Sequence, residues 1–127
     1  MRLAEQSTNE TFIRWVEGRL SEAGAGDEVA ALVRYDGPKE SRELRVYLVC
    51  TNGLVLVAEH GDTQSLRRLL WRDVGKVSLR CEVGADDVLW WVLDLPDIAV
   101  ELRERGGLAA HFLAFATEVM DRRPGAP

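Results

Sequence analysis

The sequence is poor in the residues that build metal and redox sites. Its 127 residues include two cysteines and two histidines. A metal site needs three or four converging ligands, and neither His60 nor His111 has a second histidine or a cysteine at ligand spacing. Cys50 and Cys81 each stand alone on the apolar face of a predicted strand, so we expect free, buried thiols in preference to a disulfide. We expect no metal ion and no cofactor.

Catalytic motifs are also missing from the sequence, which has no P-loop, G-x-G-x-x-G or G-x-S-x-G pattern. Carboxylates are paired at Asp86/Asp87 and Asp94/Asp97. Both pairs flank predicted turns, where aspartate supports the local backbone more often than it acts as a general acid. We expect a protein that is not an enzyme; the alternative is an enzyme with a dispersed site.

Long apolar runs and excess positive charge are absent as well. No run approaches the roughly 18 residues that indicate a transmembrane helix. The first residues, Met1–Gln6, lack the apolar core of a signal peptide, so we expect a cytoplasmic protein. The net charge of −5 argues against a nucleic-acid binder, whose affinity depends on neutralising phosphates.

The sequence does contain six strand-like segments separated by tight turns, from Glu43 to Arg103. Residues 43–50 alternate with the period of two that is typical of a half-buried strand. Asn52-Gly53 follows as a strong hairpin signal, and turn clusters recur after it. The pattern predicts strands at 43–50, 54–59, 65–71, 76–83, 88–93 and 98–103. Residues 28–35 are predicted as a preceding strand, although so short an apolar run also fits a helix.

Both ends of the chain read as helices. Ser7 and Glu10 form a predicted capping box, followed by an apolar face on one side of a helix that ends at Gly24–Gly26: Phe12, Trp15, Val16 and Leu20. After Gly106-Gly107, a second helix is predicted from its broad apolar face: Leu108, Phe112, Phe115, Ala116 and Val119.

Seven strands followed by one amphipathic helix is the order of elements in the pleckstrin-homology (PH) superfold. Residues 48–57 (LVCTNGLVLV) and 69–77 (LLWRDVGKV) resemble the hairpin and the strand–turn–strand of GRAM-like and bacterial PH-like domains. The resemblance covers residues 28–123. It implies a mainly β fold: seven antiparallel strands in two near-orthogonal sheets, forming a partly open barrel that the C-terminal helix caps.

The N-terminal helix is an addition to that pattern. We therefore expect a helical extension at 1–26, a PH-like domain at 27–123 and a disordered tail at 124–127.

The resemblance also raises lipid binding, because many PH domains hold phosphoinositides with two basic residues one apart on the second strand. The candidates here are Lys39, Arg42 and Arg45. Arg42 and Arg45 are three apart, so a regular strand directs them to opposite faces. Peripheral membrane contact through the loop 36–41 is therefore the alternative reading, and it is expected to be weak. A second basic group is expected to form a solvated outer face: Arg67, Arg68, Arg72 and Lys76.

Residues 88–93 do not alternate, and this is the strongest functional signal in the sequence. Trp90 and Trp91 must point to opposite faces of one strand, which leaves open which of them faces outward. An outward tryptophan makes an apolar patch that needs a cover. Phe12 and Trp15 of the N-terminal helix are one candidate cover, and a second chain is another. We expect a self-associating scaffold module, forming a dimer or binding a protein partner through Trp90, Trp91, Phe12 and Trp15.

Overall fold

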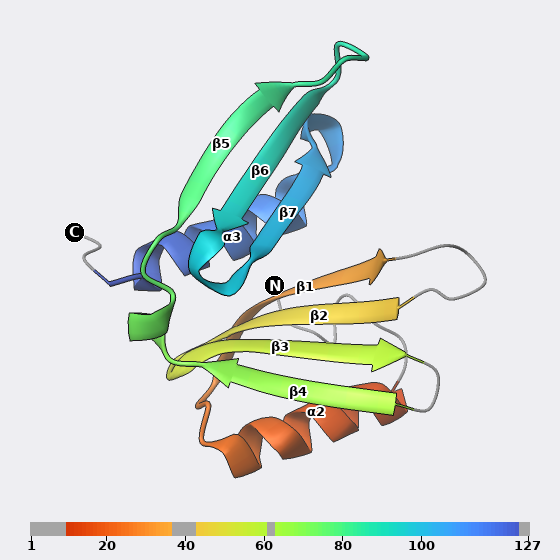
Figure 1. Ribbon diagram of the computed structural model, residues 1–127. Coiled ribbons are helices and arrows are strands. Elements are labelled where there is room, and N and C mark those ends of the chain that lie inside the picture. Colours follow the sequence, from red (N-terminus) through yellow and green to blue (C-terminus); the bar gives the residue numbers. More distant parts are fainter. Residues whose placement is uncertain (1–9, 37–42, 61–62, 125–127) are drawn as a thin grey trace. The chain divides into compact units, whose positions relative to one another are not determined.

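A computed structural model describes residues 10–36, 43–60 and 63–124 (Figure 1). The chain divides between Leu70 and Trp71 into two compact units, and each is described by itself. The fold is mainly β: its seven strands form a four-stranded and a three-stranded antiparallel sheet, and a helix follows the last strand. The predicted count of seven strands and the C-terminal helix are therefore confirmed.

The first unit is a helix followed by a four-stranded meander. Its elements are α2 (Glu10–Ala23), β1 (Glu28–Asp36), β2 (Glu43–Cys50), β3 (Gly53–His60) and β4 (Thr63–Leu69), with the strands in the order β1-β2-β3-β4. The bounds of β2 are those that the alternation predicted. Residues 28–35, which fitted a strand or a helix, form a strand whose register shifts between Glu28 and Ala30.

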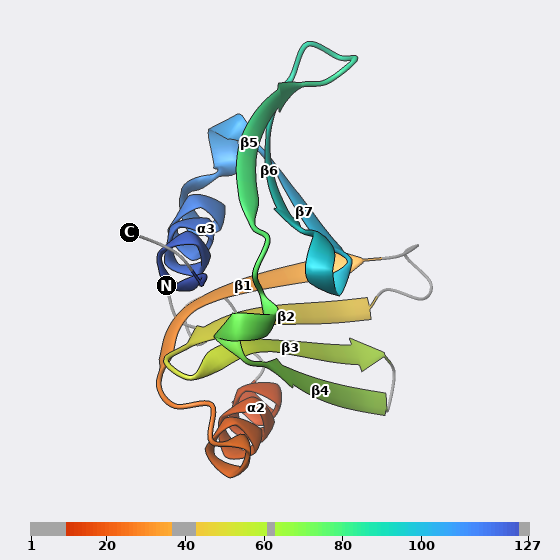
Figure 2. The same cartoon turned by 60° about the vertical axis from the view of Figure 1, so that its left-hand side comes forward.

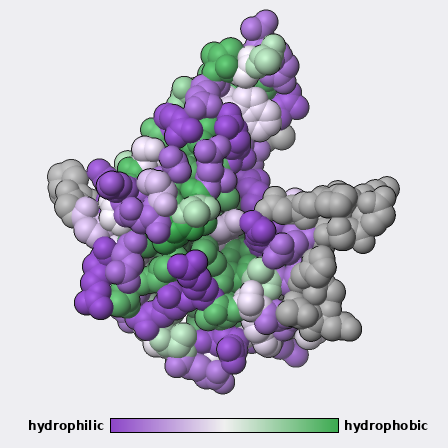
Figure 3. Space-filling model, in the orientation of Figure 1, coloured by the Kyte–Doolittle hydropathy of each residue, from purple (hydrophilic) through white to green (hydrophobic). Residues whose placement is uncertain are grey.

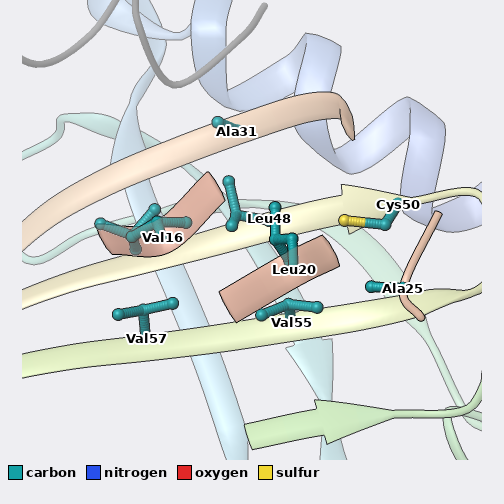
Figure 4. Close-up of a cluster of buried hydrophobic side chains, with 9 residues drawn as sticks. Val16, Leu20, Ala25, Ala31, Leu48, Cys50, Val55 and Val57 are labelled. Atoms are coloured by element: carbon teal, nitrogen blue, oxygen red, sulfur yellow. The ribbon is translucent and has the colours of Figure 1, made fainter. Parts of the chain in front are cut away.

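Helix α2 packs its apolar side on one face of this sheet. Val16 and Leu20 lie in a buried cluster with strand residues that all point to the same face (Figure 4). The half-buried Trp15 packs against the edge of this cluster. Each large aliphatic side chain buried here contributes about 1.5–3 kcal/mol to stability. The strand residues of the cluster are Ala31, Val46, Leu48, Cys50, Val55 and Val57.

Hydrogen bonds connect the turn between α2 and β1 to the β2–β3 loop and to β4. Arg68 donates from Nη1 to the carbonyl of Ala23 (2.8 Å) and from Nη2 to the carbonyl of Asn52 (3.2 Å). Asn52 donates from Nδ2 to the carbonyl of Gly24 (3.2 Å). The prediction that Arg68 belongs to a solvated face is therefore wrong. Arg68 binds a carbonyl at the end of α2 that has no partner within the helix.

The β2–β3 hairpin lies where the Asn-Gly signal predicted it, but glycine has a different role. The two loop residues are Thr51 and Asn52, and Gly53 is already paired with Cys50 as the first residue of β3. Neither Asn52 nor Gly53 has a positive φ. A Cβ on Gly53 would lie 2.5 Å from the carbonyl oxygen of Leu69, so close approach of the β4 backbone requires glycine here.

The second unit is a three-stranded meander followed by a helix. Its elements are η2 (Trp71–Asp73), β5 (Ser78–Val83), β6 (Leu89–Leu95), η3 (Pro96–Ile98), β7 (Val100–Arg105), η4 (Gly106–Leu108) and α3 (Ala110–Arg122). Trp71 and Ile98, predicted in strands, lie in 3₁₀ turns instead. In the first turn the Val74 amide donates to the carbonyl of Trp71 (3.0 Å), and in the second the Ala99 amide donates to the carbonyl of Pro96 (3.1 Å).

Helix α3 lies alongside the three-stranded sheet in both ribbon views (Figures 1 and 2). Its buried side chains are four of the five that the apolar spacing predicted for one face: Phe112, Phe115, Ala116 and Val119. No helix in the described residues is long and apolar enough to cross a membrane.

Two glycines of the first unit test this account of the α2–β1 turn. Gly26 has a φ of +83°, and a Cβ there would overlap the hydroxyl of Thr51. We expect Gly26→Ala to lower the free energy of unfolding by about 2 kcal/mol or more. Gly18 lies inside α2 with nothing near its Cβ position, so Gly18→Ala should raise it by about 0.5–1 kcal/mol. Urea unfolding of both variants measures the change in the free energy of unfolding. Similar changes at the two positions would contradict the requirement for glycine at position 26.

Candidate functional site

The loop end of the β5–β6 hairpin presents an exposed apolar pair. Val83 and Leu89 are direct cross-strand neighbours, and their exposed fractions are 68% and 45%. Hydrophobic surface is visible at this end of the hairpin, at the top of Figure 3. Within the described residues, Tyr35 is the one other large apolar side chain with comparable exposure. This pair is the first feature of the candidate site.

A tight loop holds the two strands together at this point. The Gly84 amide donates to the carbonyl of Val88 (2.9 Å), and the Asp87 amide donates to the carbonyl of Gly84 (3.0 Å). Asp87 takes a left-handed φ of 60°, as expected of a type I turn followed by a bulge. Asp86 accepts from the Val88 amide through Oδ1 (3.2 Å). Asp86 thus supports the backbone, as predicted, and Asp97 does the same by accepting from the Lys76 amide (3.0 Å).

Val83 and Leu89 belong to what we term the apolar side of the three-stranded sheet. Burial on this side decreases toward the loop: Leu93 and Leu102 are buried, Trp91 is half-buried and Cys81 is exposed. The apolar side therefore extends past the part of the sheet that is covered. Its members are Leu79, Cys81, Val83, Leu89, Trp91, Leu93, Leu95, Val100 and Leu102.

The two cysteines differ more than the sequence predicted. Both are free, and Cys50 is buried in the α2 cluster, but Cys81 is exposed. Burial raises the pKa of the Cys50 thiol to about 11, and the nearby Glu28 carboxylate adds to this effect. The prediction of a buried thiol is therefore wrong for Cys81, because the apolar side is uncovered at this point of β5.

The opposite side of the same sheet carries a network of ion pairs, which we term the charged side. Glu82 accepts from Arg80 Nε and from Arg103 Nη2, both at 2.7 Å. Arg103 also reaches Glu101 (3.0 Å), and Arg80 lies 3.7 Å from Asp94. The hydrogen bond from Arg80 lowers the pKa of the Glu82 carboxyl and raises that of Arg80.

Val92 lies at the centre of the charged side and is fully buried. Its cross-strand neighbours are Arg80 on β5 and Arg103 on β7, whose side chains are partly exposed and paired with carboxylates. Trp90 lies next to it, half-buried between Glu82 and Arg105. The cover predicted for the outward tryptophan, the N-terminal helix or a second chain, stays a prediction.

The four aromatic residues predicted as partner contacts fall into two pairs. Trp90 and Trp91 lie on opposite sides of β6, both half-buried. Trp15 belongs to the first unit, where the guanidinium of Arg19 lies 5.8 Å from the centre of its ring. Phe12 is part of α2, and its side chain lies outside what the structure describes. Val83 and Leu89 were not predicted as contact residues. The sequence signal that could have identified them is their position on either side of the Gly84–Asp87 turn, because strand ends next to a turn are less covered by other elements.

The predicted lipid contacts are described only in part. Lys39 and Arg42 lie outside the described residues. Arg45 donates to Oε2 of Glu43 on the same strand (3.2 Å), and this bond raises the pKa of Arg45. Its charge is therefore already paired with a carboxylate of its own chain.

Two hollows lie within single units. One, of about 660 Å³, lies beside the end of α2 and has an acidic lining of Glu17, Asp27 and Glu28. The other, of about 370 Å³, lies next to the hairpin, between Leu89 and Gly106.

In the described part of the chain, no group of three or more histidine, cysteine or acidic side chains is placed to hold a metal ion. Comparison with family models, curated proteins and solved structures finds no match to this chain.

Thiol labelling tests the contrast between the two cysteines. We expect a maleimide near neutral pH to modify one thiol quickly in the folded protein, because Cys81 is exposed while Cys50 is buried with a raised pKa. Cys81→Ser should remove the fast reaction, and Cys50→Ser should leave it unchanged. Equal labelling rates for both thiols in the folded protein would show that one of these placements is wrong.

Proposed function

We propose that the protein is a non-catalytic interaction module of the PH-like type, which self-associates through the end of the β5–β6 hairpin. The observation that carries this proposal is the exposed pair Val83 and Leu89, at the end of an apolar side whose burial decreases toward the loop. Contiguous apolar surface of this kind marks interaction sites in soluble proteins.

The residues around the pair are suited to an interface. Trp91 lies on the same side and is half-exposed, and aromatic side chains at such positions dominate binding energies. Burying apolar surface contributes about 25 cal/mol per Å². Glu104 lies opposite Trp91 on the same side, so a charged residue borders the apolar surface, as at the polar rim of other specific interfaces.

The non-catalytic reading rests on how the polar residues are used. Asp86 and Asp97 accept hydrogen bonds from backbone amides. Glu82 and Glu101 pair with arginines. These four carboxylates already have structural partners, so none of them is held ready to transfer a proton to a substrate.

The PH-like arrangement itself is part of the proposal: two near-orthogonal sheets form a partly open barrel that α3 caps. The order of four strands, three strands and a helix supports it. So does the face of the first sheet opposite α2, which carries Ala30, Leu32, Val49 and Leu54 and needs a cover. Methyl NOEs from Leu32 or Leu54 to protons of residues 71–127 are expected, and their complete absence would refute the arrangement.

Self-association is measured directly by sedimentation equilibrium of the full chain. At roughly 100 μM, a contact with a micromolar Kd is nearly saturated and the dimer should dominate. Val83→Arg places a charge in the apolar contact and should weaken association at least about tenfold. Tyr35→Arg, a change at a similarly exposed residue of the first unit, should leave association unchanged.

A strict monomer at that concentration would overturn the proposal. Salt-sensitive co-sedimentation of the monomer with anionic vesicles would favour peripheral membrane binding through the basic first loop instead.

A further inference from the structure

The backbone of β5 is open on one side. This strand pairs with β6 alone and forms an edge of the three-stranded sheet. Gly84 and Val88 are a hydrogen-bonded pair, and bonded and non-bonded pairs alternate along antiparallel strands. The register then makes Val83–Leu89 and Cys81–Trp91 non-bonded pairs. The amides and carbonyls of Leu79, Cys81 and Val83 therefore point away from β6, toward the free edge.

β5 also lacks most of the features that protect edge strands from pairing, and its two charged residues, Arg80 and Glu82, are of opposite sign. Residues 78–83 contain no proline and no lysine, and their register with β6 is unbroken. The other edges differ: β1 has a register shift at Glu28/Ala30, and β4 carries Arg67 beside Arg68, which is bonded to α2. On β7, pairing of two copies about Leu102 would place Val100 against Glu104 of the other copy.

Among the three registers centred in the middle of β5, at Arg80, Cys81 or Glu82, charge favours one for pairing with a second β5. Antiparallel pairing of identical strands about a two-fold axis places one residue opposite itself. An axis at Arg80 sets two arginines against each other, and an axis at Glu82 sets two glutamates against each other; both are destabilising. An axis at Cys81 places Arg80 opposite Glu82 of the second copy, twice.

We propose that β5 pairs antiparallel with β5 of a second copy, about a two-fold axis at Cys81. This inference rests on the self-association proposed above and gives it a geometry. It joins the two three-stranded sheets into one continuous sheet, in which the free amides of Leu79, Cys81 and Val83 gain partners.

The apolar side fits the same register. Leu79 lies opposite Val83 of the second copy, so in each copy the exposed Val83 gains one aliphatic neighbour. The two Cys81 side chains meet on the axis. On the charged side, Arg80 and Glu82 keep their contact within the chain and gain a partner across the axis, while Asp94, Glu101 and Arg103 lie on β6 and β7, farther from it.

Charge complementation between two variants tests the register. Arg80→Glu presents two glutamates along the edge, and Glu82→Arg presents two arginines. Each variant alone should dimerise at least about tenfold more weakly than the natural chain. An equimolar mixture should recover the dimer, because every cross-axis pair is again of opposite sign. Circular dichroism of each variant checks that it is folded, and a mixture that stays monomeric while both variants are folded would overturn the proposal.

Cross-linking of the natural chain gives an independent test that needs no charge change. A short bis-maleimide should join two chains through Cys81, and Cys50→Ser should cross-link equally well. Cys81→Ser should give no covalent dimer. If the natural chain sediments as a dimer but does not cross-link, self-association stands and the β5 pairing is wrong. If it sediments as a monomer, both proposals fail.

Discussion

Every β-sheet has two faces and two edges, and the apolar side chains and unpaired amides on them need a cover. The first unit meets this constraint on one face by packing α2 on it, with Val16 and Leu20 against strand residues such as Leu48 and Val55. Arg68 then fixes the end of the helix to the sheet. In the second unit, burial decreases along the apolar side, and Val83 and Leu89 at its end are exposed.

The two sides of the three-stranded sheet deal with apolar residues in different ways. On the charged side, Val92 is fully buried, and its cross-strand neighbours Arg80 and Arg103 are held by Glu82 and Glu101. Exposed ion pairs add little stability individually; here they hold two long side chains on strands that flank a buried valine. On the apolar side Cys81, Val83 and Leu89 are exposed, which is why association is expected there.

The strands could be predicted from the sequence because alternation is a local property. The bounds of β2 and the buried residues of α3 followed from spacing alone. Trp71 and Ile98 were wrongly predicted in strands, since a short 3₁₀ turn beside a strand can continue its apolar pattern. Arg68 and Cys81 were misjudged for a related reason. Whether an arginine binds a distant carbonyl, or a thiol is covered, depends on elements far away in the sequence.

Residue-resolved hydrogen exchange of the β5 backbone tests the central claim most directly, because it reports whether the free edge gains partners. At high protein concentration the amides of Leu79, Cys81 and Val83 should exchange slowly, and on dilution they should exchange quickly. The amides of Arg80 and Glu82 face β6 and should stay protected at both concentrations. Fast exchange of Leu79, Cys81 and Val83 at every concentration would contradict the account.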